Sequence, residues 1–99
     1  MFFFSKTDIN RAVEECRNTP GAVLLDVREA EEFCSGHIPG AVNVPLSAID
    51  SISIPKTGVL FVYCLRGTRS KRAVSILKRM GYDARGIGGI VSYKGETER

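Results

Sequence analysis

The chain has 99 residues, of which 43% are hydrophobic and 25% are charged, and its formal net charge is +3. These values fit one ordinary soluble globular domain. No apolar stretch approaches the roughly 20 residues that a membrane-spanning helix requires. The apolar residues 1–4 lack the basic leader of a signal peptide, so we expect a cytoplasmic protein that does not bind membranes.

In the first half of the chain, short apolar stretches alternate with turn signals. Residues 2–4 predict an edge strand, and Thr7 is a candidate N-cap of the helix that follows. Residues 22–27 form an almost continuous apolar run, which is typical of a strand covered on both sides. A short helix is predicted over 29–33 and a short strand over 41–44.

The alternation continues in the second half. Residues 45–52 predict a helical turn, and residues 59–63 predict the central strand. Apolar residues then recur at helical spacing until Gly81, a natural stop, and 84–87 predict a last strand. The polar residues 94–99 are expected to fray. We therefore expect the whole chain to form one α/β domain, with an open, mostly parallel sheet and helices on both faces.

The predicted central strand runs straight into Cys64, and a helical pattern begins a few residues later. The thiol is therefore expected at the carboxyl edge of the sheet, where ligands bind in folds of this class. Backbone N–H groups and the helix dipole there favour the thiolate over the thiol. Arg66 and Arg69 add two positive charges beside it. We interpret Cys64 as a nucleophile.

The other cysteines favour no disulfide or metal chemistry. Three cysteines are an odd number, and none belongs to a Cys-x-x-Cys pair. Cys34 and His37 have a ligand-like spacing, but without a second such pair we expect no metal site. Cys16 lies on the apolar face of the first predicted helix, so we expect it in the core.

Charge is distributed unevenly. Ten basic and three acidic residues lie in the second half of the chain, and no acid lies between Cys64 and Met80. The basic residues of the predicted helix have two interpretations. They form either a solvated helix face or a docking surface for an acidic partner. Nucleic acid binding is not expected, because no aromatic residues are interleaved for base stacking.

Several segments resemble the rhodanese-like domain family, and in particular its single-domain thiosulfate sulfurtransferases. Residues 24–29, 32–33 and 36–45 are similar to the family's first signature, and the strand entering Cys64 and the later Gly88-Gly89 are similar to its second half. This resemblance covers roughly residues 7 to 93. It implies a five-stranded parallel sheet with the catalytic loop after the fourth strand.

The resemblance implies sulfane sulfur transfer. In this chemistry a thiolate takes the outer sulfur of thiosulfate or a persulfide donor, holds it as a persulfide, and passes it to a small thiol or a protein acceptor. No cofactor is expected beyond the persulfide on Cys64. The turn after Cys64 is expected to curl into a nest of N–H groups that binds the anion, with help from the two arginines. The candidate substrate-binding residues are Leu65, Arg66, Gly67, Thr68, Arg69 and Ser70.

Loop length separates neighbouring chemistries. Cys64 to Arg69 forms a Cys-x4-Arg loop, like those of single-domain sulfurtransferases, whereas related phosphatases carry a Cys-x5-Arg loop wide enough for phosphate. Ser70 occupies the position that a phosphatase arginine would need. A phosphatase or arsenate reductase is therefore disfavoured. A persulfide carrier that serves a partner protein is the alternative that stays open.

Four further residues are expected to support the structure rather than the chemistry. Asp26 and Arg28 follow a buried strand, and we expect them to pair with the backbone or with Glu32. His37 is the only histidine. The resemblance implies that it orders the Gly-His-Ile-Pro turn, and a thiolate activated by a nest needs no base.

Overall fold

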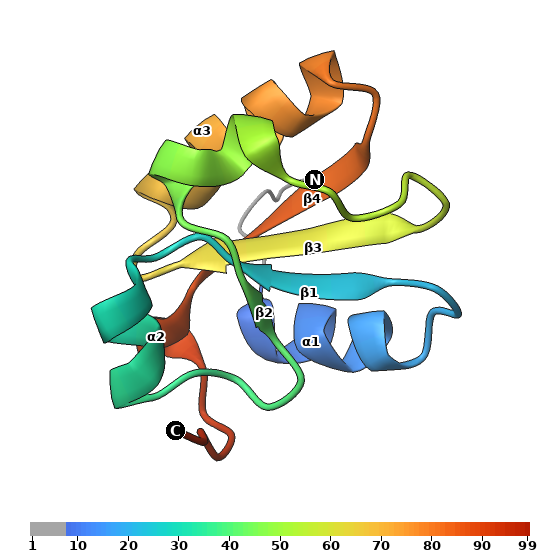
Figure 1. Ribbon diagram of the computed structural model, residues 1–99. Coiled ribbons are helices and arrows are strands. Elements are labelled where there is room, and N and C mark those ends of the chain that lie inside the picture. Colours follow the sequence, from blue (N-terminus) through green and yellow to red (C-terminus); the bar gives the residue numbers. More distant parts are fainter. Residues whose placement is uncertain (1–7) are drawn as a thin grey trace, which may run out of the picture.

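A four-stranded parallel sheet, in the order β2-β1-β3-β4, forms the centre of the computed structural model, which describes residues 8–99 (Figure 1). The strands are β1 Val23–Asp26, β2 Val42–Asn43, β3 Val59–Cys64 and β4 Asp83–Gly89. The helices are α1 Ile9–Arg17, α2 Ala30–Ser35 and α3 Thr68–Arg79, with 3-10 turns η1 Leu46–Ser51 and η2 Ile90–Ser92. The expected α/β fold is confirmed.

The sheet differs from the expectation in its number of strands. Five strands were expected, and four are present among residues 8–99. The strand predicted over 2–4 and the Thr7 cap lie outside the described residues. In the described part, the cap of α1 is Asp8, whose carboxylate accepts the Asn10 N–H at 3.0 Å.

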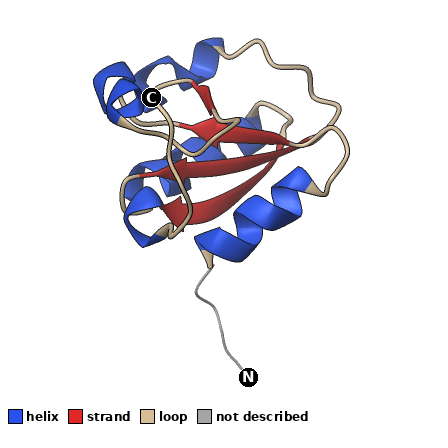
Figure 2. Cartoon of the chain, turned by 90° about the horizontal axis from the view of Figure 1, so that it is seen from below, coloured by secondary structure: helices blue, strands red, loops and turns tan. Residues whose placement is uncertain are grey.

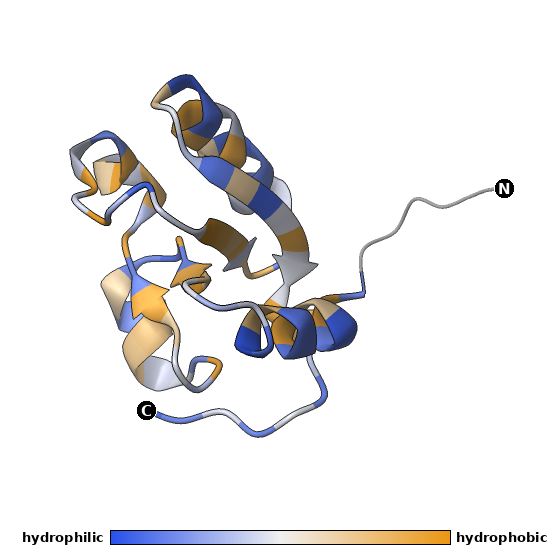
Figure 3. Ribbon diagram, turned by 90° about the vertical axis from the view of Figure 1, so that its right-hand side faces the viewer, coloured by the Kyte–Doolittle hydropathy of each residue, from blue (hydrophilic) through white to orange (hydrophobic). Residues whose placement is uncertain are grey.

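Helices cover both faces of the sheet, with α3 and η1 on one face and α1 on the other (Figures 1 and 2). Side chains of β3 alternate between the two resulting cores: Leu60 and Val62 pack toward α3, whereas Phe61 and Tyr63 pack toward α1. The apolar sides of α1 and α3 face the sheet (Figure 3). Each fully buried leucine or phenylalanine stabilises the fold by about 1.5–3 kcal/mol.

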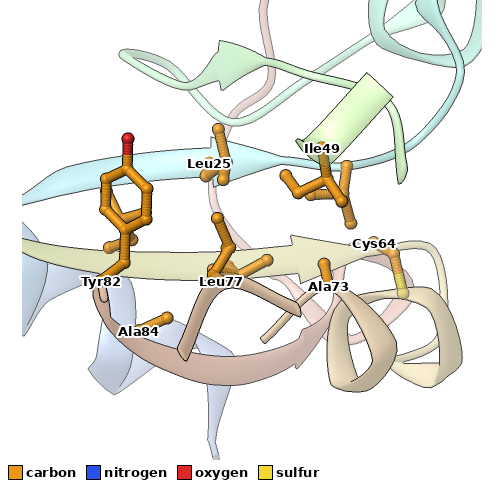
Figure 4. Close-up of a cluster of buried hydrophobic side chains, with 10 residues drawn as sticks. Leu25, Ile49, Cys64, Ala73, Leu77, Tyr82 and Ala84 are labelled. Carbon is orange, nitrogen blue, oxygen red and sulfur yellow. The ribbon is translucent and has the colours of Figure 1, made fainter. Parts of the chain in front are cut away.

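Cys64 belongs to the same row as Leu60 and Val62, because it lies two residues further along β3. Its side chain therefore points to the α3 face of the sheet, beside Ala73 (Figure 4). Cys16 lies buried on the apolar face of α1, as its spacing predicted. The alternation of β3 thus places Cys64 under the start of α3.

The end of β4 is shaped to meet the loop after Cys64. A register shift between Val62 and Tyr63 marks a bulge in the pairing with β4. Gly88 there has a φ of 100°, which favours glycine. A Cβ on Gly89 would overlap the backbone of Leu65. The strand is therefore longer than the predicted 84–87, since these glycines continue the pairing and let the loop approach closely.

The polar tail 94–99 was expected to fray, but in the structure it pairs with the turn at His37. The backbones of His37 and Glu98 exchange two hydrogen bonds, of 2.8 and 2.9 Å. The Glu98 carboxylate also lies 3.3 Å from Nε2 of His37. The tail is held because it pairs with the backbone of a turn that is itself buried.

Candidate active site

The Cys64 thiol lies at the last position of β3 and is only 1% exposed. Its Sγ accepts the N–H of Gly67 at 3.0 Å and the N–H of Ser70 at 3.3 Å. Gly67 is the N-cap of α3 and has a φ of 110°, a conformation that other residues rarely adopt. The turn after β3 therefore aims two amides at the N-terminus of α3 toward one sulfur atom.

These surroundings favour the thiolate. Burial raises the pKa of the Cys64 thiol, but hydrogen bonds from Ser70, Gly67 and Arg66 outweigh that effect and lower the pKa below its ordinary value. The positive end of the α3 dipole acts in the same direction. At a given pH, a larger share of Cys64 is therefore thiolate than in an ordinary cysteine, and the thiolate is the nucleophilic form.

A pocket of about 160 Å³ opens above the thiol and is lined by Cys64, Leu65, Arg66, Thr68 and Arg69. The two remaining loop residues, Gly67 and Ser70, donate backbone N–H groups to the sulfur, and the Ser70 hydroxyl donates to the Gly67 carbonyl at 3.0 Å. The Leu65 carbonyl accepts the N–H of Val91 at 3.2 Å, which ties the loop to η2. Four of the six predicted loop residues thus line the pocket with Cys64, and the other two, Gly67 and Ser70, donate to its sulfur.

Arg69 lines the pocket, but its charge is already paired. Its guanidinium binds the Glu32 carboxylate through two hydrogen bonds, of 2.7 and 3.0 Å. This pair lowers the pKa of Glu32 to about 2, so Glu32 stays ionised. Arg66 is exposed and has no ion-pair partner among residues 8–99. It is the pocket arginine available to an anion.

Asp26 and Arg28 pair with each other rather than with Glu32. The Asp26 carboxylate accepts from Arg28 Nη2 at 2.7 Å and from its Nε at 3.0 Å, and both side chains are buried. The same Nη2 donates to the carbonyl of Gly36 at 2.8 Å. Asn43 donates to the backbone carbonyls of both residues. This buried network joins the ends of β1 and β2 to the end of α2.

His37 holds the turn that follows α2. Its Nδ1 lies 2.9 Å from the Phe33 carbonyl, and its ring stacks on Phe33 at a centroid distance of 3.7 Å. Its Nε2 faces Glu98. Tyr63 supports the same turn by accepting the Ile38 N–H at 3.1 Å. The sequence reasoning did not single out Tyr63, because a tyrosine in a buried strand carries no signal for such a distant partner.

The part of the chain that the structure describes holds neither a cluster of metal-ligating side chains nor a membrane-spanning helix. Residues 8–99 contain no group of three histidine, cysteine or acidic side chains arranged to hold a metal ion. Cys34 is exposed and Cys16 is buried. None of the helices in these residues is long and apolar enough to cross a membrane.

Comparison with known proteins identifies relatives that carry out or are linked to sulfur transfer. The chain is 32% identical over 92 residues to the adenylyltransferase and sulfurtransferase uba4 of Ogataea parapolymorpha, covering 88% of this chain and 24% of that protein. It is 32% identical to the putative sulfur carrier protein YrkF of Bacillus subtilis, covering 76% and 43%. It is 37% identical to the thiosulfate sulfurtransferase PspE of Escherichia coli, covering 59% and 60%. The chain thus spans less than two thirds of each of these relatives.

Solved structures match most of the chain. A rhodanese-like domain protein from Staphylococcus aureus superposes with a TM-score of 0.81 at 27% identity, covering 96% of this chain and 97% of that one. The human single-domain sulfurtransferase TSTD1 superposes with a TM-score of 0.73 at 27% identity, covering 83% and 88%. The sequence pattern of the rhodanese-like domain family matches residues 9–96. The chain therefore belongs to the rhodanese-like domain family.

Proposed function

We propose that the chain is a sulfurtransferase that moves sulfane sulfur from thiosulfate or a persulfide donor to a thiophilic acceptor. The observation that carries this proposal is the Cys64 thiol, which accepts two backbone N–H groups at the base of a small pocket. The names of the relatives support sulfur transfer as the class of reaction. We place the reaction in the cytoplasm and assign it no cofactor beyond the sulfur held on Cys64.

In the first step, the Cys64 thiolate attacks the outer sulfur of thiosulfate. A new S–S bond forms to Sγ, the original S–S bond breaks, and its electron pair leaves with sulfite. The products are sulfite and a deprotonated Cys64 persulfide, so charge is conserved and no external oxidant is needed. With a persulfide donor, the donor's thiolate is the leaving group instead.

In the second step, an acceptor such as cyanide or a thiolate attacks the outer sulfur of the Cys64 persulfide. The electron pair of the broken bond returns to Sγ, and the thiolate is regenerated. The N–H groups of Gly67 and Ser70 stabilise this leaving thiolate as they stabilise the resting one. The same donors thus serve both halves of the reaction.

Arg66 supplies the positive charge for the anionic donor. Arg69 is already neutralised by Glu32, so one exposed guanidinium remains beside the pocket. A charge-assisted hydrogen bond from Arg66 to the sulfonate would orient the outer sulfur toward Sγ and would strengthen as sulfite departs. Arg69 instead holds the loop against α2.

Two other functions compete. A persulfide carrier would accept sulfur from a partner and use thiosulfate poorly, and the name of the YrkF relative keeps this candidate open. A phosphatase or arsenate reductase is weaker, because the loop is one residue short and the pocket of about 160 Å³ has a single unpaired arginine.

Intact-mass measurement after incubation with thiosulfate tests the proposal, together with a thiocyanate assay. We expect the protein to gain one sulfur atom and the Cys64→Ser variant to gain none. A Cys34→Ser variant is the matched control, because Cys34 is exposed but lies outside the pocket. Absence of both the adduct and thiocyanate would reject thiosulfate chemistry, and loading from a protein persulfide alone would assign the carrier function.

A further inference from the structure

The exposed side of α3 carries four basic residues that no acid neutralises. They are Lys71, Arg72, Lys78 and Arg79, here called the basic face, and all four are exposed. At 100° per residue they fall within one third of the helix circumference, with the exposed Ser75 between them. None of them forms an ion pair within residues 8–99.

A contribution to the stability of α3 explains the positive charge of two of the four basic residues, but not that of the other two. Lys78 and Arg79 lie in the last turn, where positive charge is favourable because the carbonyl ends point there. Lys71 and Arg72 lie near the start of the helix, which has no acid in its first turn. Positive charge at that end opposes the helix dipole. Folding therefore does not explain these two cations.

The basic face begins at the mouth of the pocket. Thr68 and Arg69 line the pocket and also open α3. Lys71 lies about 4.5 Å further along the helix axis than Thr68, and Arg79 lies about 16 Å further. Arg66, on the opposite side of Thr68 in the chain, is exposed as well. Positive charge thus extends from the pocket over the length of the helix.

We propose that the basic face docks an acidic protein that presents a cysteine on an extended segment and accepts sulfur from Cys64. This inference rests on the proposed function. An extended segment is required because Cys64 is 1% exposed beneath a pocket of about 160 Å³, which a flat surface could not enter. An acidic partner matches the charge, and it would be steered to the pocket mouth by the same field.

The transfer itself is balanced. The partner's cysteine thiolate attacks the outer sulfur of the Cys64 persulfide, an S–S bond forms on the partner, and the Cys64 S–S bond breaks. Its electron pair returns to Sγ, so a partner persulfide and the Cys64 thiolate are the products. RNA is the other polyanion that could match the charge. Residues 65–81 contain no aromatic side chain on which bases could stack, which favours a protein.

Two synthetic peptides, each with a single cysteine, test the proposal. In the acidic peptide the cysteine is flanked by Asp and Glu, and in the neutral peptide it is flanked by Asn and Gln. Protein preloaded with sulfur is mixed with each peptide, and the transfer rates are compared. The test variant changes all four residues of the basic face to glutamine, which preserves helix propensity. The control variant changes Arg11, Arg17, Lys94 and Arg99 to glutamine, so that both variants have the same net charge.

For each protein, the rate of sulfur transfer to the acidic peptide is divided by the rate of transfer to the neutral peptide. We expect this ratio to be about tenfold higher for the wild type and the control variant than for the test variant. High salt should remove the difference, because the Debye length falls from about 10 Å at 0.1 M to about 3 Å at 1 M. At saturating thiosulfate, the extent of sulfur loading should be equal in all three proteins. Equal rate ratios would overturn the proposal.

A binding measurement separates this proposal from the proposed function. The Cys64→Ser protein, with and without the basic-face changes, is titrated with the acidic peptide and with a single-stranded RNA oligonucleotide. Weaker peptide binding in the changed protein supports docking even if Cys64 never loads sulfur. Tighter binding of RNA than of the peptide, dependent on the basic face, would contradict an acidic protein as the occupant.

Discussion

Two regions at the carboxyl edge of the sheet use arginine in opposite ways. After β1, Arg28 is buried and bound to Asp26 and to a backbone carbonyl. After β3, Arg66 is exposed and unpaired within the described residues, beside Cys64. A buried charge must be matched where it lies, whereas an exposed one is free to meet a ligand. The first region stabilises the fold, and we propose the second as the site of the chemistry.

Glu32 connects the two regions. Its carboxylate accepts the Glu29 N–H at 3.0 Å in the capping box at the start of α2, and it also binds Arg69 of the loop. The helix after β1 thereby fixes one side of the pocket after β3. Arg69 lies in the second region, but like Arg28 in the first region it is bound to a carboxylate.

The largest expected effect is on stability, in the region after β1. Asp26→Asn leaves the Arg28 charge buried without its counter-ion and should lower the free energy of unfolding by about 3–5 kcal/mol. Glu15→Gln is the control, because it breaks an exposed pair with Arg85 of 3.0 Å and should cost at most about 1 kcal/mol. Urea denaturation measures both. Equal losses would show that burial does not distinguish the two pairs.

The next effect is on substrate binding, in the region after β3. Arg66→Gln should raise the KM for thiosulfate about tenfold, a loss of ~1.4 kcal/mol, and leave the unfolding free energy unchanged. Arg11→Gln, an exposed arginine on α1, should change neither quantity. Steady-state kinetics at low ionic strength measures the shift. A wild-type KM in the Arg66 variant would mean that the N–H groups alone bind the anion.

The smallest effect concerns the link between the regions. The pKa of Glu32 is lowered from 4.5 to about 2, chiefly by its bond to Arg69. Its stabilisation is therefore complete above about pH 4.5 and is lost as the pH falls through about 2. The stability of Glu32→Gln should decline less over that interval than that of the wild type. Glu31→Gln, an exposed neighbour, should follow the wild type, and parallel curves for all three would refute the link.

The sequence predicted local features better than distant pairings. The apolar run into Cys64 and the helical spacing after it were sufficient to predict β3, the loop and α3, because these signals lie within one short segment. The pair between Glu32 and Arg69 joins residues 37 positions apart, and only the packing of α2 against the loop brings them together. The pairing of Glu98 with His37 was also missed, because the two residues are distant in the chain and the polar tail carries no periodic signal.

The pKa of Cys64 tests the central claim most directly. The rate of Cys64 alkylation by iodoacetamide is followed across pH, with the modified peptide resolved by mass spectrometry so that the other cysteines do not contribute. A model thiol peptide, with a pKa of about 8.5, is measured alongside. The geometry predicts a midpoint below that of the peptide, because Gly67 and Ser70 donate to Sγ. A midpoint equal to or above that of the peptide would contradict a loop built to hold a thiolate.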